Sequence, residues 1–325
     1  MKRVLGSAVF KVIISLSLII LLLYLMRGKY AEIVLALKNI NLWMFALGFA
    51  VFIITLVVAS YRFFLIIKAQ GDPDVNFKEA VSLTFIGVFF NNFLPTSIGG
   101  DLVKAYYLSH KTCDRMGSFT SVLVDRLIGL LTMIFMASAA LLFIQSSLIG
   151  DDIRRALYVV TAVALVVVLL IVNKTFAKSL SWVLAFAKPM TVKLKDAYYT
   201  VHRYKHNKRL MAKSLAISVV SQLLSYISFG LVAFSIGASI SPIDALLRIP
   251  LVSLMSMLPS LNGLGLREGA TIVLFGPMIG KENAFAVSIL WILVLLMSSV
   301  LGGFIYAFSP QFKVKFNELK KEAVR

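Results

Sequence analysis

Six long apolar runs dominate the pattern of this chain. They cover residues 9–26, 42–67, 117–145, 156–172, 211–237 and 284–308. Each run has the length that a helix needs to cross a bilayer, about 17–25 residues. We therefore predict six spanning helices in an all-α, polytopic membrane protein. The first run lacks a small-residue cleavage site, and basic residues follow it at once, so we expect a retained helix and not a cleaved signal peptide.

Two shorter apolar segments are interrupted by proline and glycine. The first interruption reads LPTSIGGDLVKA over 94–105, and a shift of 164 positions brings it onto LPSLNGLGLREG over 258–269. The same shift brings the flanking apolar runs together. Interruptions at corresponding places in two halves of a membrane protein are typical of transporters built from internal repeats. We predict repeat 1 over approximately 42–145 and repeat 2 over approximately 211–308.

Basic residues predict how these segments lie in the membrane. Residues 173–213 hold ten Lys and Arg against one acid, and five more follow Phe308. Lys and Arg accumulate on the cytoplasmic side, so we expect a basic cytoplasmic loop at 173–213 and both termini in the cytoplasm. The second interrupted segment then has to enter and leave the membrane on one face. Together, the eight apolar segments predict six spanning helices plus two re-entrant helical hairpins in an inverted-topology repeat; a plain eight-segment helical bundle is the alternative.

The two interruptions expose backbone groups that can bind an anion. Each frees backbone N–H and C=O groups at membrane depth, where only protein or a polar cavity can satisfy them. The helix that begins after each interruption presents unpaired N–H groups and the positive end of its dipole, which favour an anion. Lys104 and Arg267 lie one turn further along, so we predict a binding site for a phosphate headgroup. Kinked helices whose charges extend to the interface are the alternative, and this is what we expect of Arg62.

Asp125 and Arg126 are the most deeply placed charges in the predicted spans. They lie about 13 Å along the helix that starts near 117, close to the bilayer centre. Adjacent residues on a helix point in different directions, so each needs a partner elsewhere. Arg126 is suited to hold a phosphate with two hydrogen bonds. The candidate partners are Asp101, Lys104, Arg267 and Glu268.

Composition narrows the class of protein further. The chain is 59% hydrophobic, with a mean hydropathy of +0.90, whereas soluble domains are roughly 45–50% apolar. The net charge of +18 fits membrane topology and anionic lipid headgroups better than nucleic acid. One cysteine, Cys113, excludes a disulfide within the chain and a multi-cysteine metal site. The sequence contains no P-loop and no zinc-protease or nucleophile-elbow motif, so we expect no cofactor, no metal and no ATP hydrolysis.

Several motifs together closely resemble one family. They read NNFLP over 91–95, GGDLVK over 99–104, VDRL over 124–127 and NGLG over 262–265, with Pro259, Arg267 and Glu268. This set resembles the flippase-like membrane domain of lysylphosphatidylglycerol synthases, over nearly the whole chain. The resemblance implies movement of lipid between leaflets, while a separate soluble domain makes the aminoacylated lipid. Only 17 residues follow Phe308, so we expect a stand-alone membrane domain that is not itself an enzyme.

The chain departs from the family pattern at three charged positions. Asp101 and Asp125 stand where the family often has Glu, which keeps the charge. Lys104 stands where Arg is common, which removes a two-pronged phosphate contact there.

These observations predict a lipid flippase or scramblase of the cytoplasmic (inner) membrane. Its substrate is expected to carry a phosphate headgroup, as in an aminoacylated phosphatidylglycerol or a polyprenyl-phosphate-linked lipid. A secondary transporter of a small soluble anion and the membrane component of a phosphatidylglycerol lysyltransferase-type system are the alternatives. Membrane lipids are the expected partners, with a second copy of the chain and a separate lipid-modifying enzyme left open. The predicted substrate-binding residues are Asn92, Pro95, Gly99, Gly100, Asp101, Lys104, Asp125, Arg126, Pro259, Asn262, Gly263, Gly265, Arg267 and Glu268.

Overall fold

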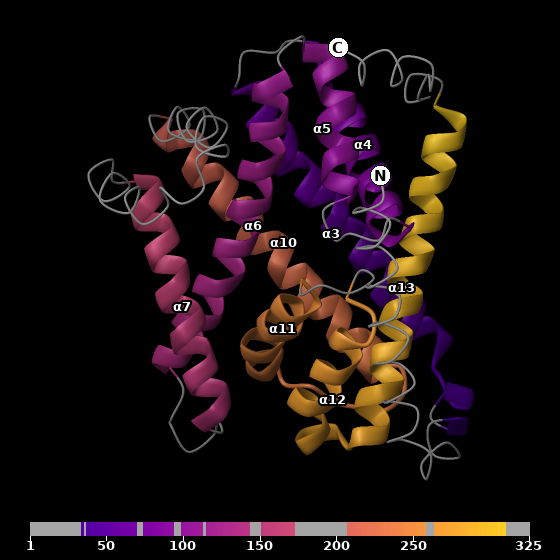
Figure 1. The fold of residues 1–325 in the computed structure, drawn as a ribbon. Helices are drawn as coiled ribbons and strands as arrows, with labels where there is room; N and C mark the ends of the chain where they lie inside the picture. Colours follow the sequence, from indigo (N-terminus) through magenta and orange to yellow (C-terminus); the bar gives the residue numbers. More distant parts are fainter. Residues whose placement is uncertain are drawn as a thin grey trace, which may run out of the picture.

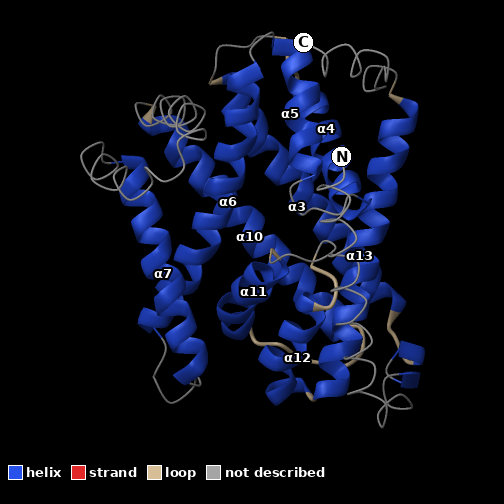
Figure 2. Cartoon of the chain, in the orientation of Figure 1, coloured by secondary structure: helices blue, strands red, loops and turns tan. Residues whose placement is uncertain are grey.

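The structure is a computed structural model that describes most of the chain. The described residues are 34–35, 37–69, 74–93, 99–112, 115–143, 151–172, 207–257 and 263–309. Within them every regular element is a helix and there is no strand (Figure 2), which confirms the all-α class. Among these residues, four helices are long and apolar enough to cross a membrane.

Two of the intervals between the four long apolar helices hold a pair of shorter helices. The long helices are α3 (Leu42–Lys68), α6 (Arg115–Phe143), α10 (Lys208–Phe234) and α13 (Lys281–Phe308). The short pairs are α4 (Phe77–Phe93) with α5 (Gly99–Thr112) and α11 (Pro242–Ser256) with α12 (Leu266–Ile279). α7 (Asp151–Val172) holds the run predicted at 156–172, but it is not among the four candidate spans. The predicted span at 9–26 lies outside the described residues.

α10 begins inside the stretch predicted as a basic cytoplasmic loop. The prediction covers 173–213, the helix starts at Lys208, and the cytoplasmic placement of this stretch remains a prediction. Asn207 explains the earlier start, because its side-chain oxygen accepts the N–H of Leu210 at 3.1 Å and caps the helix. The remainder of the predicted loop, 173–206, lies outside the described residues.

The two short pairs lie at opposite ends of the molecule. Figure 1 shows α4 and α5 near one end and α11 and α12 near the other, with α3, α6, α10 and α13 running between them. α4 has 17 residues and α5 has 14. At 1.5 Å per residue these are about 25 and 21 Å long, shorter than a hydrocarbon core of about 30 Å.

The helices also recur at a nearly constant interval along the chain. α3, α4, α5 and α6 start 165 to 167 positions before α10, α11, α12 and α13, respectively. This interval agrees with the shift of 164 positions that relates the two interruptions. The boundaries of the two repeats remain a prediction from the sequence.

Small residues allow the helices to approach closely. A methyl group on Gly100 would lie 1.9 Å from the carbonyl oxygen of Gly87, so α5 and α4 meet backbone to backbone. Asn91 then accepts the N–H of Gly100 at 2.8 Å and satisfies the start of α5. Between α3 and α10, Ser228 donates to the carbonyl of Gly48 at 2.8 Å. Such small-residue contacts are the usual means by which membrane helices pack, because lipid provides no hydrophobic drive between them.

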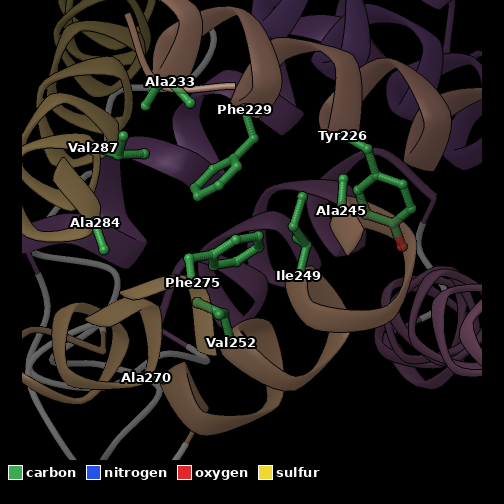
Figure 3. Packing of buried hydrophobic residues seen from close by; sticks show 11 residues of the cluster. Tyr226, Phe229, Ala233, Ala245, Ile249, Val252, Ala270, Phe275, Ala284 and Val287 are labelled. Atoms are coloured by element: carbon green, nitrogen blue, oxygen red, sulfur yellow. The ribbon is translucent and has the colours of Figure 1, made fainter. Parts of the chain in front are cut away.

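The second short pair is held by an aromatic core. Figure 3 shows Phe229 of α10 facing Phe275 of α12, with Ile249 of α11 beside them. The two ring centroids lie 5.4 Å apart, and the Phe229 ring also meets the edge of Trp291 on α13 at 5.2 Å. Aromatic pairs at this spacing stabilise a core beyond their buried area. The packing therefore positions α11 and α12 against the long helices.

Candidate functional site

A buried ion pair joins α3 to α6. Nε of Arg62 donates to Oδ1 of Asp125 at 2.7 Å, and Nη1 donates to the hydroxyl of Ser218 on α10. Arg62 and Asp125 are 7% and 8% exposed. The expectation that Arg62 extends to the interface is therefore wrong. Gly129, one turn after Asp125, leaves room for the guanidinium, since Nη1 lies 3.1 Å from where a methyl group would stand.

Arg126 forms a separate ion pair with Asp101. Asp101 lies in the first turn of α5, directly after the first interrupted segment. It is one of the partners expected for Arg126 from the sequence. Asp125 and Arg126 thus point to different helices, as their adjacent positions on α6 predict. The pair connects the start of α5 to the middle of α6.

Lys104 belongs to the buried charges around Arg62. Its side chain is 7% exposed, and Nζ lies 4.1 Å from the centroid of the Phe63 ring. Phe63 follows Arg62 directly in α3. A cation over an aromatic face is stabilised by the ring quadrupole. Lys104 therefore supports the contact of α5 with α3. It does not border either of the two cavities that Arg126 and Arg267 border.

Arg267 and Glu268 form the corresponding group at the start of α12. Nε and Nη2 of Arg267 donate to Oε1 of Glu268 at 3.1 and 3.0 Å. The other oxygen, Oε2, accepts the N–H of Gly265 and caps the helix. Gly263 and Gly265 have φ of +79° and +84°, a backbone conformation that favours glycine. Because the carboxylate of Glu268 turns back toward the helix start, these two adjacent residues do pair.

Two adjoining cavities lie between these groups. The first has a volume of about 260 Å³ and is bordered by Arg267, and the second has a volume of about 340 Å³ and is bordered by Arg126. Both are bordered by Asn91, Ser253 and Ser256. Arg267 at the start of α12 and Arg126 in α6 thus border two cavities that share three polar residues.

Some of the other predicted site residues lie at the cavities or at helix starts, and others lie outside the described residues. Asn92 borders the first cavity and donates to the carbonyl of Leu295 at 3.2 Å. Gly99 and Gly100 form the first turn of α5. The predicted residues that lie outside the described part of the chain are Pro95, Pro259 and Asn262.

Sequence reasoning missed several polar residues of the cavities. Ser253 and Ser256 are one helical turn apart on α11, and a polar pair at that spacing in an apolar helix was a usable signal. Gln222 and Ser225 of α10 have the same spacing and gave the same signal. Asn91 lies in the NNFLP motif over 91–95, but it was not among the predicted substrate-binding residues.

The chain is similar to three archaeal membrane proteins. It is 25% identical over 325 residues to a UPF0104 membrane protein of Methanocaldococcus jannaschii, covering 92% of this chain and 94% of that protein. It is 23% identical over 306 residues to a UPF0104 membrane protein of Pyrococcus horikoshii, covering 86% of this chain and 89% of that protein. It is 24% identical over 304 residues to a UPF0104 membrane protein of Methanothermobacter thermautotrophicus, covering 85% of this chain and 86% of that protein. No solved structure matches the chain.

A family model matches residues 9–303. The match includes helices α3 to α12, most of α13 and both groups of charged residues. This agrees with the resemblance that the interrupted segments indicated. The chain is a multi-pass membrane protein that belongs to the family of the lysylphosphatidylglycerol synthase TM region.

Proposed function

We propose that this protein is a lipid flippase or scramblase that moves lipids with a phosphate headgroup between the two leaflets. The observation that carries the proposal is that Arg126 and Arg267 border two adjoining cavities that share Asn91, Ser253 and Ser256. Arginine binds phosphate through a planar set of donors. In this proposal a headgroup that leaves one arginine passes Asn91, Ser253 and Ser256 and then meets the other.

The arrangement of the short helices supports this proposal. α4 and α5 on one side, and α11 and α12 on the other, are each too short to cross the membrane and lie at opposite ends of the bundle (Figure 1). We infer two re-entrant hairpins, one opening to each leaflet, in an inverted-topology repeat. The near-constant interval between corresponding helices supports the same reading. Movement of one repeat against the other would open the cavities alternately to each side.

The ion pairs suggest how a phosphate is bound and released. Arg126 and Arg267 each have a carboxylate partner, Asp101 and Glu268. In the proposed cycle a phosphate binds guanidinium N–H groups that the carboxylate does not use, such as Nη1 of Arg267, and the carboxylate keeps its own hydrogen bonds. The arginine charge is therefore compensated at every stage, which avoids a bare charge at membrane depth. The acyl or prenyl chains remain in the surrounding lipid.

The remaining parts of the proposal follow from the sequence. We place the protein in the cytoplasmic membrane with both termini in the cytoplasm, because of the positive charge at 173–213 and after Phe308. Without an ATPase motif, transport runs downhill or is coupled to protons or to the membrane potential. The chain itself would catalyse no reaction, and its partners would be membrane lipids.

Exchange of labelled phosphatidylglycerol between leaflets of liposomes tests the proposal. The test variant combines Arg126→Gln with Asp101→Asn, which removes both charges of the pair and keeps groups that can hydrogen-bond. We expect exchange to fall roughly tenfold or more, because a hydrogen bond to a charged group is worth about 1.5–3 kcal/mol and about 1.4 kcal/mol is tenfold. The matched control is Arg155→Ala, whose side chain is 73% exposed.

The outcomes separate the proposal from its alternatives. Unchanged exchange in the neutral-pair variant would show that Arg126 does not bind the headgroup. Uptake of free glycerol phosphate by wild-type liposomes, without any lipid exchange, would favour a carrier of small soluble anions.

A further inference from the structure

The borders of the two cavities carry only one sign of charge. Arg267 borders the first and Arg126 the second, and neither cavity is bordered by an Asp or Glu among the described residues. A headgroup in this region meets positive charge and neutral polar groups.

The nearest carboxylates are already used by the protein. Oε1 of Glu268 accepts from Nε and Nη2 of Arg267, and Oε2 accepts the N–H of Gly265. Both oxygens are therefore engaged at the start of α12, and Glu268 is 4% exposed. Asp101 is paired with Arg126. An ammonium group in the cavities would lack a carboxylate partner and would lie near an arginine, which is costly away from water.

The neutral polar groups suit a different kind of headgroup. The first cavity is bordered by two asparagines and three serines. The hydrogen bonds of the described residues leave the hydroxyls of Ser225 and Ser253 unused. Amides and hydroxyls both donate and accept, so they match the hydroxyl groups of a polyol. Trp291 and Phe229 border the same cavity and offer apolar faces to the C–H groups of such a headgroup.

From this lining we propose that the substrate's headgroup is a phosphodiester that carries an uncharged, hydroxyl-bearing group, and that amine-bearing headgroups are rejected. This inference rests on the proposed function and narrows it. The phosphate binds Arg126 or Arg267, and the glycerol or sugar hydroxyls bind the serines and asparagines. A glycerophospholipid and a polyprenyl-phosphate-linked sugar share this chemistry, whereas the lysyl ester of phosphatidylglycerol does not.

Two measurements on the full chain test the inference. The first is leaflet exchange of four labelled lipids: phosphatidylglycerol, its lysyl ester, phosphatidylethanolamine and a polyprenyl-phosphate-linked hexose. The second is binding of the corresponding water-soluble headgroups, followed by fluorescence of Trp291. Trp43→Phe and Trp182→Phe leave Trp291 as the sole tryptophan of the three in the sequence. The first and last lipids should exchange, and their headgroups bind, at least roughly tenfold better than the two amine-bearing ones.

The most informative variant is one that should change which lipid is exchanged. Ser253→Asp adds a carboxylate to the shared border of both cavities, so we expect exchange of the lysyl ester to rise and that of phosphatidylglycerol to fall. Ser253→Ala, which changes little in volume, should lower phosphatidylglycerol exchange without admitting the lysyl ester. This second variant keeps the test decisive if Ser253→Asp does not fold.

Each outcome bears on a different part of the argument. Equal or better exchange and binding of the lysyl ester by wild type would overturn the headgroup inference and leave the flippase proposal standing. Selective headgroup binding without exchange of any lipid would overturn the flippase proposal and support the headgroup inference. Neither binding nor exchange would overturn both. Preference between phosphatidylglycerol and the polyprenyl-linked hexose would identify which source of the shared chemistry the site takes.

Discussion

Arg62 on α3 and Asp125 on α6 form a buried ion pair, with Nε and Oδ1 2.7 Å apart, although 63 positions separate them in the chain. Ser218 on α10 accepts a further hydrogen bond from the same guanidinium. One side chain thus joins three of the four candidate spans. The group ties α6, which carries Arg126, to α3 and α10, so its loss should lower the stability of the protein.

Arg62→Leu should destabilise the protein strongly. The substitution leaves the carboxylate of Asp125 buried without its cation, and removing one partner of a buried pair costs about 3–5 kcal/mol. Replacing both residues, by Arg62→Leu with Asp125→Leu, should restore most of the loss, because no bare charge remains. Unfolding in detergent, followed by circular dichroism, measures both variants. A double variant no more stable than Arg62→Leu would contradict this account.

Gly100→Ala should separate α5 from α4. The added methyl group would lie 1.9 Å from the carbonyl oxygen of Gly87, and backbone cannot move aside cheaply. We expect a loss of roughly 1–3 kcal/mol, as for overpacked cores. The matched control is Gly230→Ala on α10, where nothing lies within 4 Å and alanine should stabilise the helix by up to about 1 kcal/mol. Thermal denaturation of both variants checks the difference, and equal shifts would refute close contact of α4 and α5.

Asp101→Asn should strengthen binding of a phosphate headgroup. The substitution removes the negative charge that compensates Arg126 but keeps an acceptor for its hydrogen bond. We expect the dissociation constant of glycerophosphoglycerol to fall about tenfold, which corresponds to about 1.4 kcal/mol. Titration calorimetry measures this, with Asp152→Asn as the control because that side chain is 95% exposed. Weaker binding would mean that Asp101 positions Arg126 and does not compete with the phosphate.

Ser228→Ala should weaken the contact of α3 with α10 by a small amount. The hydroxyl of Ser228 donates to the carbonyl of Gly48 at 2.8 Å in a buried position. Hydrogen bonds between membrane helices average about 0.6 kcal/mol, so only a small shift of the unfolding midpoint is expected. Gly48→Leu should have a much larger effect, since Val232 lies 3.1 Å and Leu231 3.3 Å from the first added carbon. Equal effects of the two substitutions would argue against close packing at Gly48.

Local patterns of apolar and helix-breaking residues were sufficient to predict where the helices lie along the chain. Apolar runs predicted the four long helices within a few residues, because burial in lipid requires a continuous apolar helix. The proline and glycine interruptions marked where α5 and α12 begin, since a new helix must start after such a break. The second interruption also pointed to Arg267, and depth within the predicted span pointed to Arg126; these are the two arginines that border the cavities.

The pairing of the charges could be read only from the folded protein. Arg62 was expected at the interface, and no spacing in the sequence links it to Asp125, because ion pairing depends on how α3 and α6 are rotated and packed. The same holds for the cavities, whose shared border combines Asn91 of α4 with Ser253 and Ser256 of α11. Helical periodicity is a short-range property, so it can be read along the chain. The choice of partner between distant helices depends on close packing in three dimensions, which no local pattern encodes.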